Sequence, residues 1–208
     1  MNKNLFGLAL LHSYFLGETQ ALLSEAPYMY NTERPLVIGH RGSFGHNPEH
    51  SVGSYADAYF GGVDFIELDV HPSKDGILVT NHDETLEQTT NVESISIFDD
   101  KKTTRLAGKG YYIDDFTLAE LKLIKRKQRY SYRSHFYDNM FGIMSAQEVV
   151  DLVNTLNADQ PRREEATEKV GLYIELKKYD SYVGEGFDTA QMLFDLLEAN
   201  GLSTIADC

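Results

Sequence analysis

The stretch VDFIELDVH, residues 63–71, decides the fold class of this chain. Successive side chains of a β-strand point to opposite faces, so this stretch would form a strand with two unlike faces. One face would be apolar and would consist of Ile66, Leu68 and Val70. The other would be mostly polar and would consist of Phe65, Glu67, Asp69 and His71. Because carboxylates are costly to bury without a partner, we expect the polar face to line a site.

A second stretch, GLYIELK (171–177), repeats this design. Its apolar face would consist of Leu172, Ile174 and Leu176. Its polar face would consist of Tyr173, Glu175 and Lys177. In a barrel of parallel strands, the apolar faces would meet the outer helices. The acidic faces would point inward, near the C-terminal strand ends where such folds place their sites.

The rest of the chain alternates between predicted strands and helices, a pattern typical of a parallel sheet covered by helices. Apolar runs predict three further strands, at 36–39, at 77–80 after the turn SKDG, and from 203 onward. Helical spacing predicts helices at 51–62, 117–127, 145–156 and 188–201. Thr117 with Glu120 and Ser145 with Glu148 have the spacing of capping boxes. The stretch from about 84 to 115 has no clear periodicity.

Length, charge and cysteine content exclude several classes of protein. The chain has 208 residues and a formal net charge of −13, which argues against nucleic acid as a partner. Its single cysteine, Cys208, leaves no pair for an intrachain disulfide. No apolar run is long enough for a stable membrane span. The sequence does not indicate an oligomeric state.

Residues 1–34 differ in composition from the rest and are interpreted as a leader. The run LFGLALLHSYFLG has the length of a signal-peptide core and is too short to span a membrane. The basic region before it is weak and no clean cleavage site follows, so an amphipathic helix is an equal alternative. If residues 1 to about 25 are a signal peptide, the protein is secreted or extracytoplasmic, and otherwise it is cytoplasmic.

Three carboxylates on the polar faces, Glu67, Asp69 and Glu175, indicate a cation site. Clustered like charges raise one another's pKa unless a cation compensates them. A hard divalent cation with oxygen ligands, Ca²⁺ or Mg²⁺, matches this set, whereas zinc favours cysteine and several histidines. The competing interpretation is that each carboxylate pairs with a nearby lysine or arginine at a surface strand end. The two same-face pairs together favour the metal site.

Two of the seven histidines stand out because each follows an apolar strand. His40 lies in VIGHRG (37–42), and His82 lies in VTNHDETL (79–86). At adjacent strand ends, the two rings could act as general acid and general base near neutral pH. Arg41 could bind an oxyanion such as phosphate through its planar guanidinium. The remaining histidines are interpreted mainly as surface or packing residues: His12, His46, His50, His71 and His135.

Four ordered blocks of the sequence resemble the glycerophosphodiester phosphodiesterase family. The blocks are HRG (40–42), NPEHS (47–51), DFIELDVHPSKDGILVTNHDETLEQTT (64–90) and YIELK (173–177). IDDFTLAELK (113–122) followed by KQRYSYR (127–133) further resembles the longer periplasmic or secreted members. The resemblance covers most of residues 35–200. Where many relatives have PENT, this chain has PEHS (48–51), which changes the helix cap but retains Glu49 as a support for the site.

This resemblance implies a (β/α)₈ barrel that hydrolyses glycerophosphodiesters, which are small-molecule substrates, to sn-glycerol 3-phosphate and an alcohol. Carried over residue by residue, it implies divalent-cation ligands at Glu67, Asp69 and Glu175. It likewise implies an acid–base pair at His40 and His82, and phosphate contacts from Arg41 and Lys177. Neither the attacking nucleophile nor the choice of acid and base between the histidines follows from the sequence.

The length of the chain suits only part of such a barrel. A (β/α)₈ barrel typically needs about 250 residues and eight strands, whereas five strands are predicted here. We therefore expect residues 35–208 to form a truncated barrel with an insertion at about 84–145.

Two alternatives to the diesterase stay open. The truncated barrel could bind a phosphodiester or lipid headgroup without catalysis, although the presence of both His40 and His82 argues against this. The chain could also be a phospholipase of the same barrel type. An interfacial apolar loop or an amphipathic basic helix would favour that function, and LKLIKRKQRY (121–130) is a candidate for it. We prefer to interpret it as a solvated helix end whose cations favour the C-terminal dipole.

Overall fold

A sheet centred on β2 (Phe65–Pro72) organises the chain. Two strands run parallel to β2 along its two edges, β1 (Ile38–Gly39) and β6 (Gly171–Leu176). The fourth strand, β3 (Leu78–Thr80), pairs with the end of β2 in the antiparallel direction. Every strand of this sheet therefore contacts β2, which carries the stretch with two unlike faces.

The structure is a computed structural model that describes residues 35–105, 108–159 and 169–202. The leader predicted at 1–34 and the strand predicted from 203 onward lie outside these residues. Within the described ranges, no helix is both long enough and apolar enough to cross a membrane.

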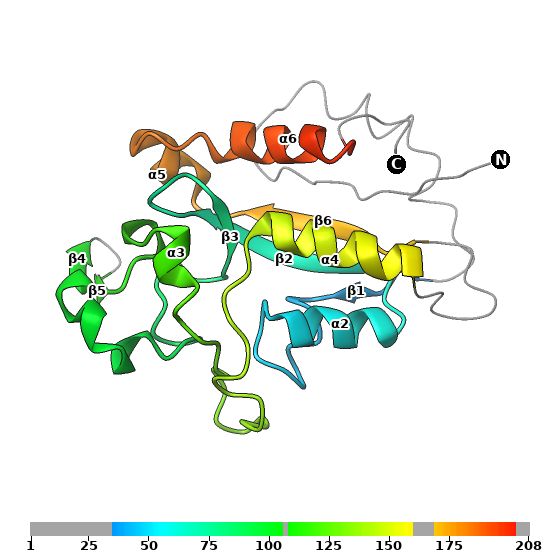
Figure 1. Cartoon of the computed structure of the whole chain (residues 1–208), viewed down its shortest axis with the longest axis horizontal. Coiled ribbons are helices and arrows are strands. Elements are labelled where there is room, and N and C mark those ends of the chain that lie inside the picture. Colours follow the sequence, from blue (N-terminus) through cyan, green and yellow to red (C-terminus); the bar gives the residue numbers. More distant parts are fainter. Residues whose placement is uncertain (1–34, 106–107, 160–168, 203–208) are drawn as a thin grey trace.

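Helices cover the apolar face of the sheet, as the sequence predicts. Three of them pack there: α2 (Val52–Phe60), α4 (Ala146–Asp159) and α6 (Thr189–Ala199). Figure 1 shows α2 beside β1, α4 along β2 and β6, and α6 beyond β6, after the short helix α5 (Tyr179–Gly184). Ile66, Leu68 and Val70 are fully buried in this core. The predicted division of β2 into an apolar and a polar face is confirmed.

The helix-start signals of the sequence are also confirmed. Ser51 caps α2 by accepting a hydrogen bond from Ser54 N at 3.1 Å. Before α4, Ser145 N donates to Glu148 Oε2 at 2.7 Å, and Glu148 N donates to Ser145 Oγ at 3.2 Å. This reciprocal pair satisfies two backbone donors that a helix N-terminus leaves free.

Two predicted strands differ from expectation. The strand at 77–80 is present as β3 but is antiparallel to β2, because the turn at 73–76 is too short for the crossover that a parallel strand needs. The strand at 36–39 is reduced to two residues. Val37 and Ile38, which the apolar run placed in this strand, are 49% and 47% exposed.

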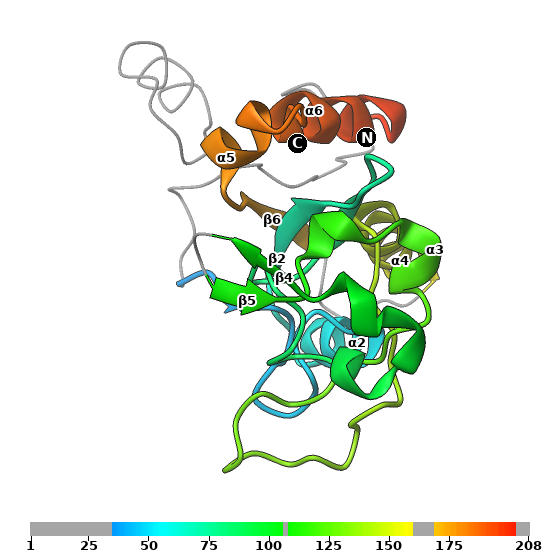
Figure 2. The same cartoon turned by 90° about the vertical axis from the view of Figure 1, so that its left-hand side faces the viewer.

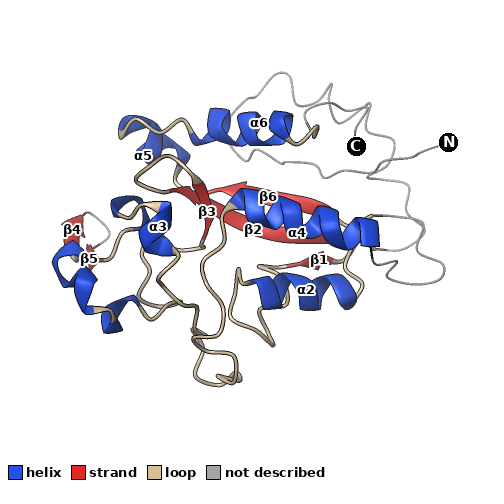
Figure 3. Ribbon diagram, viewed as in Figure 1, coloured by secondary structure: helices blue, strands red, loops and turns tan. Residues whose placement is uncertain are grey.

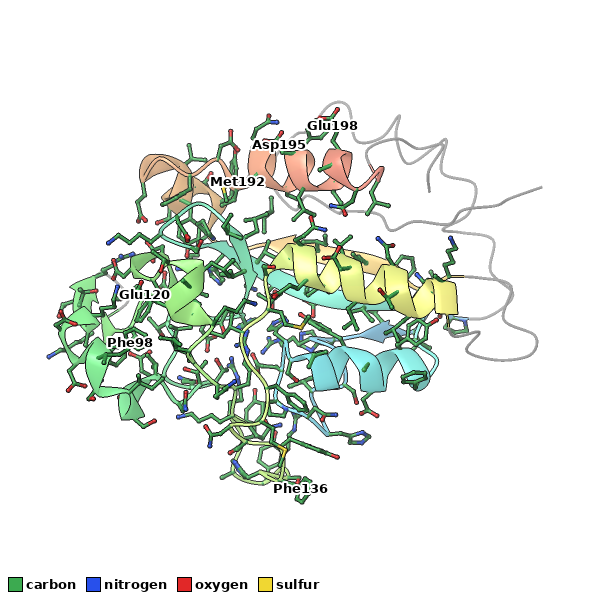
Figure 4. All side chains as sticks on the ribbon, in the orientation of Figure 1. Phe98, Glu120, Phe136, Met192, Asp195 and Glu198 are labelled. Atoms are coloured by element: carbon green, nitrogen blue, oxygen red, sulfur yellow. The ribbon has the colours of Figure 1, made fainter. Side chains whose placement is uncertain are left out.

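Residues 84–145, predicted as an irregular insertion, build a second hydrophobic core. Their short elements are η1 (Val92–Ser94), η2 (Ser96–Lys101), β4 (Thr103–Arg105), β5 (Gly108–Gly110), η3 (Ile113–Asp115) and α3 (Leu118–Leu121). Phe98, labelled in Figure 4, is 2% exposed in this core, which also includes Val79 of β3. Figures 1 and 2 show β4, β5 and α3 at the end of the sheet where β2 leads into β3.

The helix predicted at 117–127 is a single turn, α3. Its capping box is present, because Thr117 N donates to Glu120 Oε2 at 2.8 Å and Glu120 N donates to Thr117 Oγ1 at 3.3 Å. After this turn the chain runs as a loop to α4 (Figure 3). Arg126 in that loop is fully buried and hydrogen-bonded, so tertiary contacts override helix propensity. Both interpretations of LKLIKRKQRY as a helix are therefore wrong.

Replacing Leu68 with alanine should lower the free energy of unfolding by about 2–5 kcal/mol, because it leaves a cavity in the core. Leu123→Ala is the matched control, since Leu123 is 55% exposed. The control should change the free energy of unfolding by about 0.5 kcal/mol or less. Urea denaturation followed by circular dichroism measures both values, and equal effects would contradict the burial of Leu68.

Candidate active site

Three carboxylates gather on the polar face where β2 and β6 run side by side. The two strands pair with Asp69 opposite Glu175. One oxygen from each of Glu67, Asp69 and Glu175 lies within 4.8 Å of the other two. Glu67 and Asp69 are 4% and 1% exposed, whereas Glu175 is partly exposed. The structure thus brings together the three residues that the sequence assigns to the polar faces.

Burial and mutual repulsion shift the two buried carboxylates in opposite directions. Burial, together with the charge of Asp69, raises the pKa of Glu67 to about 8. Burial alone would also raise the pKa of Asp69, but the hydrogen bond from His50 and the charge of Lys177 lower it below its ordinary value. Two like charges this close favour ionisation of only one of them unless a cation compensates both.

The donor set suits a hard divalent cation. All three groups offer carboxylate oxygens, which are the ligands that Ca²⁺ and Mg²⁺ prefer. Asp69 Oδ1 is buried, and the ammonium group of Lys177 lies 3.2 Å from it. Clustered carboxylates raise one another's pKa unless a cation compensates them, so the cluster suits a bound cation. The residues present therefore fit a divalent-cation site.

Lys177, predicted to contact phosphate, lies at the edge of this carboxylate cluster. Its Nζ is 2.8 Å from Glu175 Oε1 and 3.2 Å from Asp69 Oδ1. Burial alone would lower the pKa of Lys177, but Glu175 and Asp69 raise it above its ordinary value. The competing interpretation, in which carboxylates pair with a basic side chain, thus describes two of the three carboxylates in this structure.

An unusual backbone conformation holds Arg41 beside the carboxylates. Its φ of 54° lies in the left-handed region, which residues other than glycine seldom adopt. Arg41 N donates to Glu67 Oε2 at 2.5 Å, and Arg41 O accepts from Ser54 Oγ at 2.8 Å. Its guanidinium lies 3.2 Å from Glu49 Oε1 and 3.6 Å from Asp69 Oδ2. Backbone strain of this kind clusters at functional sites.

Gly42 completes the turn because a side chain does not fit there. Its φ is 77°, and a Cβ atom at this position would lie 2.6 Å from the carbonyl carbon of Ser54. The glycine of HRG therefore allows α2 to approach the end of β1, where His40 and Arg41 lie.

The two predicted acid–base histidines follow β1 and β3, which are not adjacent but share β2 as a partner. His40 is exposed, and its ring packs edge-on against Phe44 with a centroid distance of 5.1 Å. Partial burial and the neighbouring Arg41 charge lower the pKa of His40. His82 is partly exposed, and its Nδ1 lies 2.7 Å from Asp83 Oδ1. Each histidine thus has a defined neighbour that limits its orientation.

A cavity of about 530 Å³ adjoins the carboxylate cluster, a volume suited to a small substrate. Its lining includes His71, His82, Asp83, Glu175 and Lys177. His40 lines a second hollow of about 380 Å³ on the β1 side, next to Phe44. The structure therefore places His82, Glu175 and Lys177 around one cavity and places His40 in a separate hollow.

Two buried histidines support the site, although their sequence context indicates only surface or packing residues. His50 is fully buried, and its Nε2 lies 3.0 Å from Asp69 Oδ2. His71 Nδ1 lies 2.8 Å from Tyr182 Oη, and its Nε2 lies 3.2 Å from the carbonyl oxygen of His82. Burial lowers the pKa of each ring to about 4. Strand alternation places His71 on the same face of β2 as Asp69, so the sequence contains a signal for His71. For His50, the only signal is that PEHS (48–51) replaces PENT.

Glu49, predicted to support the site, is buried between two arginines. It is 2% exposed, and Arg41 Nη1 donates to its Oε1 at 3.2 Å. Arg129 Nη2 donates to the same oxygen at 2.8 Å. Arg129 lies in the segment interpreted as a solvated helix end, so no sequence pattern predicted that it would contact Glu49.

The order of these residues along the chain matches a known family. The profile of the glycerophosphoryl diester phosphodiesterase family matches residues 40–204. The chain belongs to this family.

Curated members of the glycerophosphoryl diester phosphodiesterase family align with most of the chain. A glycerophosphodiester phosphodiesterase of Arabidopsis thaliana is 39% identical over 150 residues, which are 70% of this chain and 38% of that protein. The Haemophilus influenzae enzyme is 29% identical over 198 residues, which are 88% of this chain and 51% of that protein. The chain therefore spans about half the length, or less, of these curated relatives.

Solved phosphodiesterase structures share the fold. A phosphodiesterase of Oleispira antarctica, in complex with the product sn-glycerol-3-phosphate, has a TM-score of 0.56 at 26% identity. The match covers 79% of this chain and 52% of that one. For a glycerophosphodiester phosphodiesterase of Agrobacterium tumefaciens, the TM-score is 0.52 at 22% identity, with 81% and 55% covered. The predicted fold, part of a (β/α)₈ barrel of the phosphodiesterase type, is confirmed.

Asp69→Asn should weaken binding of Ca²⁺ and Mg²⁺ by at least about tenfold, because it retains the side-chain shape and removes a ligand charge. Isothermal titration calorimetry of the full chain measures this affinity. Asp195→Asn is the control, since Asp195 lies on α6 and hydrogen-bonds Gln191 instead. Unchanged cation affinity in Asp69→Asn would exclude Asp69 as a ligand.

Proposed function

We propose that this chain hydrolyses glycerophosphodiesters to sn-glycerol 3-phosphate and an alcohol with the help of a divalent cation, Ca²⁺ or Mg²⁺. Family membership and the names of its relatives support this reaction class. The observation that carries the proposal is the convergence of Glu67, Asp69 and Glu175 beside the cavity lined by His82 and Lys177. If residues 1 to about 25 are a signal peptide, the protein would be secreted or extracytoplasmic, which agrees with the resemblance of 113–122 and 127–133 to the longer periplasmic or secreted members.

Glu67, Asp69 and Glu175 would hold the cation through their carboxylate oxygens. A divalent cation bound there supplies polarisation of the phosphoryl oxygens and a lowered pKa for a bound hydroxyl or water. The backbone N–H of Arg41 orients Glu67, and His50 orients Asp69. Such supporting bonds fix ligand oxygens before the substrate arrives.

His40 and His82 would transfer the protons. The lowered pKa of His40 keeps its ring neutral near pH 7, as a general base requires. His40 would take the proton of the attacking hydroxyl or water. His82 would give a proton to the leaving oxygen through Nε2, since its Nδ1 is paired with Asp83.

Arg41 and Lys177 would bind the phosphate. Once the carboxylates are neutralised by a cation, the ammonium group of Lys177 is free to turn from Asp69 and Glu175 toward the phosphate oxygens. Arg41 keeps its guanidinium near Asp69 through its contact with Glu49. Two cationic groups of this kind would offset the acidic field of the chain at the point where an anionic substrate binds.

A phospholipase acting on intact lipid is the second candidate. The loop at 128–141 exposes four large side chains beside the site: Tyr132, Phe136, Tyr137 and Met140, which are 76%, 71%, 36% and 55% exposed. Figure 4 shows Phe136 at the outer end of this loop. The loop adjoins the histidine side of the site, because Arg133 Nη1 donates to Phe44 O at 3.1 Å. Aromatic side chains at such a surface suit the boundary of a lipid layer.

A coupled assay for glycerol 3-phosphate release from glycerophosphocholine tests the proposed reaction. We expect release by the full chain, loss of release with a chelator, and recovery when Ca²⁺ or Mg²⁺ is returned. Turnover of phosphatidylcholine vesicles without turnover of glycerophosphocholine would contradict the diesterase and support the phospholipase. If the chain binds a cation but turns over neither substrate, the result would favour non-catalytic binding of a phosphodiester or lipid headgroup.

His40→Ala and His82→Ala should each lower kcat by about 10²–10⁴-fold, the usual contribution of general acid–base catalysis. His46→Ala is the matched control, because His46 lies in the same loop as His40 and its side chain is 80% exposed. Steady-state kinetics in the same assay measure all three variants. Near-normal kcat in either of the first two variants would remove that histidine from the mechanism.

A further inference from the structure

Two arginines from one segment bond to the residues on either side of His82, which follows β3. Arg126 is fully buried, and its Nη1 donates to Asn81 Oδ1 at 2.5 Å. Its Nη2 donates to the carbonyl oxygen of Thr80, the last residue of β3. The backbone immediately before His82 is therefore bonded to a segment about 45 residues further along the chain.

Arg129, the second arginine, joins two carboxylates on different segments. Its Nη2 donates to Asp83 Oδ2 at 2.9 Å and to Glu49 Oε1 at 2.8 Å, and its Nε lies 2.7 Å from Glu49 Oε2. The side chain is 10% exposed. A planar guanidinium suits this arrangement, because its fixed fork can serve two acceptors at once.

Asp83 shares its two oxygens between Arg129 and His82. Oδ2 accepts from Arg129, and Oδ1 lies 2.7 Å from His82 Nδ1. Burial alone would raise the pKa of Asp83, but its bond to His82 and the charge of Arg129 lower it. Each oxygen of the ionised Asp83 carboxylate is thus held by one neighbouring side chain. A carboxylate fixed in this way selects the tautomer and the ring orientation of its histidine.

We infer that Arg129 is a positioning residue for His82 and acts through Asp83. The inference rests on the role of His82 in the proposed function. Arg129 fixes the direction of Oδ1, which receives the Nδ1 proton of His82. The ring then directs Nε2 to the cavity, where this nitrogen can carry the proton that His82 gives to the leaving oxygen.

The segment that carries Arg129 is anchored well enough to serve this role. Lys127 N donates to Thr89 O at 2.8 Å, and Gln128 Nε2 donates to Phe44 O at 3.1 Å. Asn139 N closes the loop by donating to Arg126 O at 2.8 Å. These bonds attach the segment both to the chain after His82 and to the turn after His40.

A purely structural role for Arg129 is the competing explanation, because Arg129 also neutralises the buried Glu49. The two explanations differ in their dependence on Asp83. Neutralisation of Glu49 does not require Asp83, whereas positioning of His82 does. A double-mutant cycle between positions 83 and 129 therefore separates them.

The first readout is the tautomer of His82, followed by ¹⁵N NMR of the full chain at a pH where the ring is neutral. We expect the Nδ1–H form in the parent, and a mixture of tautomers in both Arg129→Gln and Asp83→Asn. Lys127→Gln is the matched control, since it removes one positive charge from the same segment and should retain the Nδ1–H form. Retention of the Nδ1–H form in a folded Arg129→Gln variant would overturn the inference.

Arg129→Lys is the second variant, used if Arg129→Gln does not fold. It keeps the charge beside Glu49 but offers a point donor in place of the fork. We expect it to fold and to lose part of the tautomer preference of His82. A lysine variant with the parent tautomer would assign Arg129 to neutralisation of Glu49 alone.

The second readout is kcat, measured wherever the chain is active. Arg129→Gln and Asp83→Asn should each lower kcat by about tenfold or more with little change in KM, and the double variant should lie within about twofold of Asp83→Asn. If the kcat losses of the two single variants instead multiply in the double variant, the inference is overturned. Because the tautomer readout needs no turnover, an inactive chain would remove the proposed function and leave the test of Arg129 intact.

Discussion

The burial of two carboxylates on one face of β2 is the constraint on which the rest of the structure depends. Glu67 and Asp69 are 4% and 1% exposed, and they lie on a strand whose other face is the centre of the hydrophobic core. The apolar face buries the strand, and the polar face then has to satisfy charges that burial makes costly. Much of what surrounds the polar face of β2 supplies groups that compensate these buried charges.

The compensating groups come from segments that are distant in sequence, and their geometry explains the local strain. Arg41 and His50 both have a φ of 54°, and each directs a hydrogen bond to one of the carboxylates. Lys177 reaches the same cluster from β6. Strained backbone persists only where its surroundings over-determine it. The turn between β1 and α2 is such a place, because its bonds to Glu67 and Asp69 hold it from both ends.

The segment at 84–145, predicted as an insertion, forms a wall of the site in space. Its own hydrophobic core includes Val79 of β3, so the insertion and the sheet share a packed boundary. Arg126 and Arg129 extend from it to the β3 end and to Glu49. The carboxylate cluster and the His82 side of the cavity are therefore supported by two different parts of the chain.

Strand alternation and family resemblance were sufficient to predict the helix-covered sheet and to place Glu67, Asp69 and Glu175 on its polar face. Those features are local, because the period of a strand is set by its own backbone. The short turn at 73–76 also contained the information that β3 is antiparallel, although the repeated strand–helix pattern led to the opposite prediction. What only the tertiary structure decided is which distant groups compensate the buried charges. In sequence, Arg126 and Arg129 have the context of solvated cations. A local pattern cannot show that their loop folds back to bond Asn81 and Glu49, which lie 45 and 80 residues away.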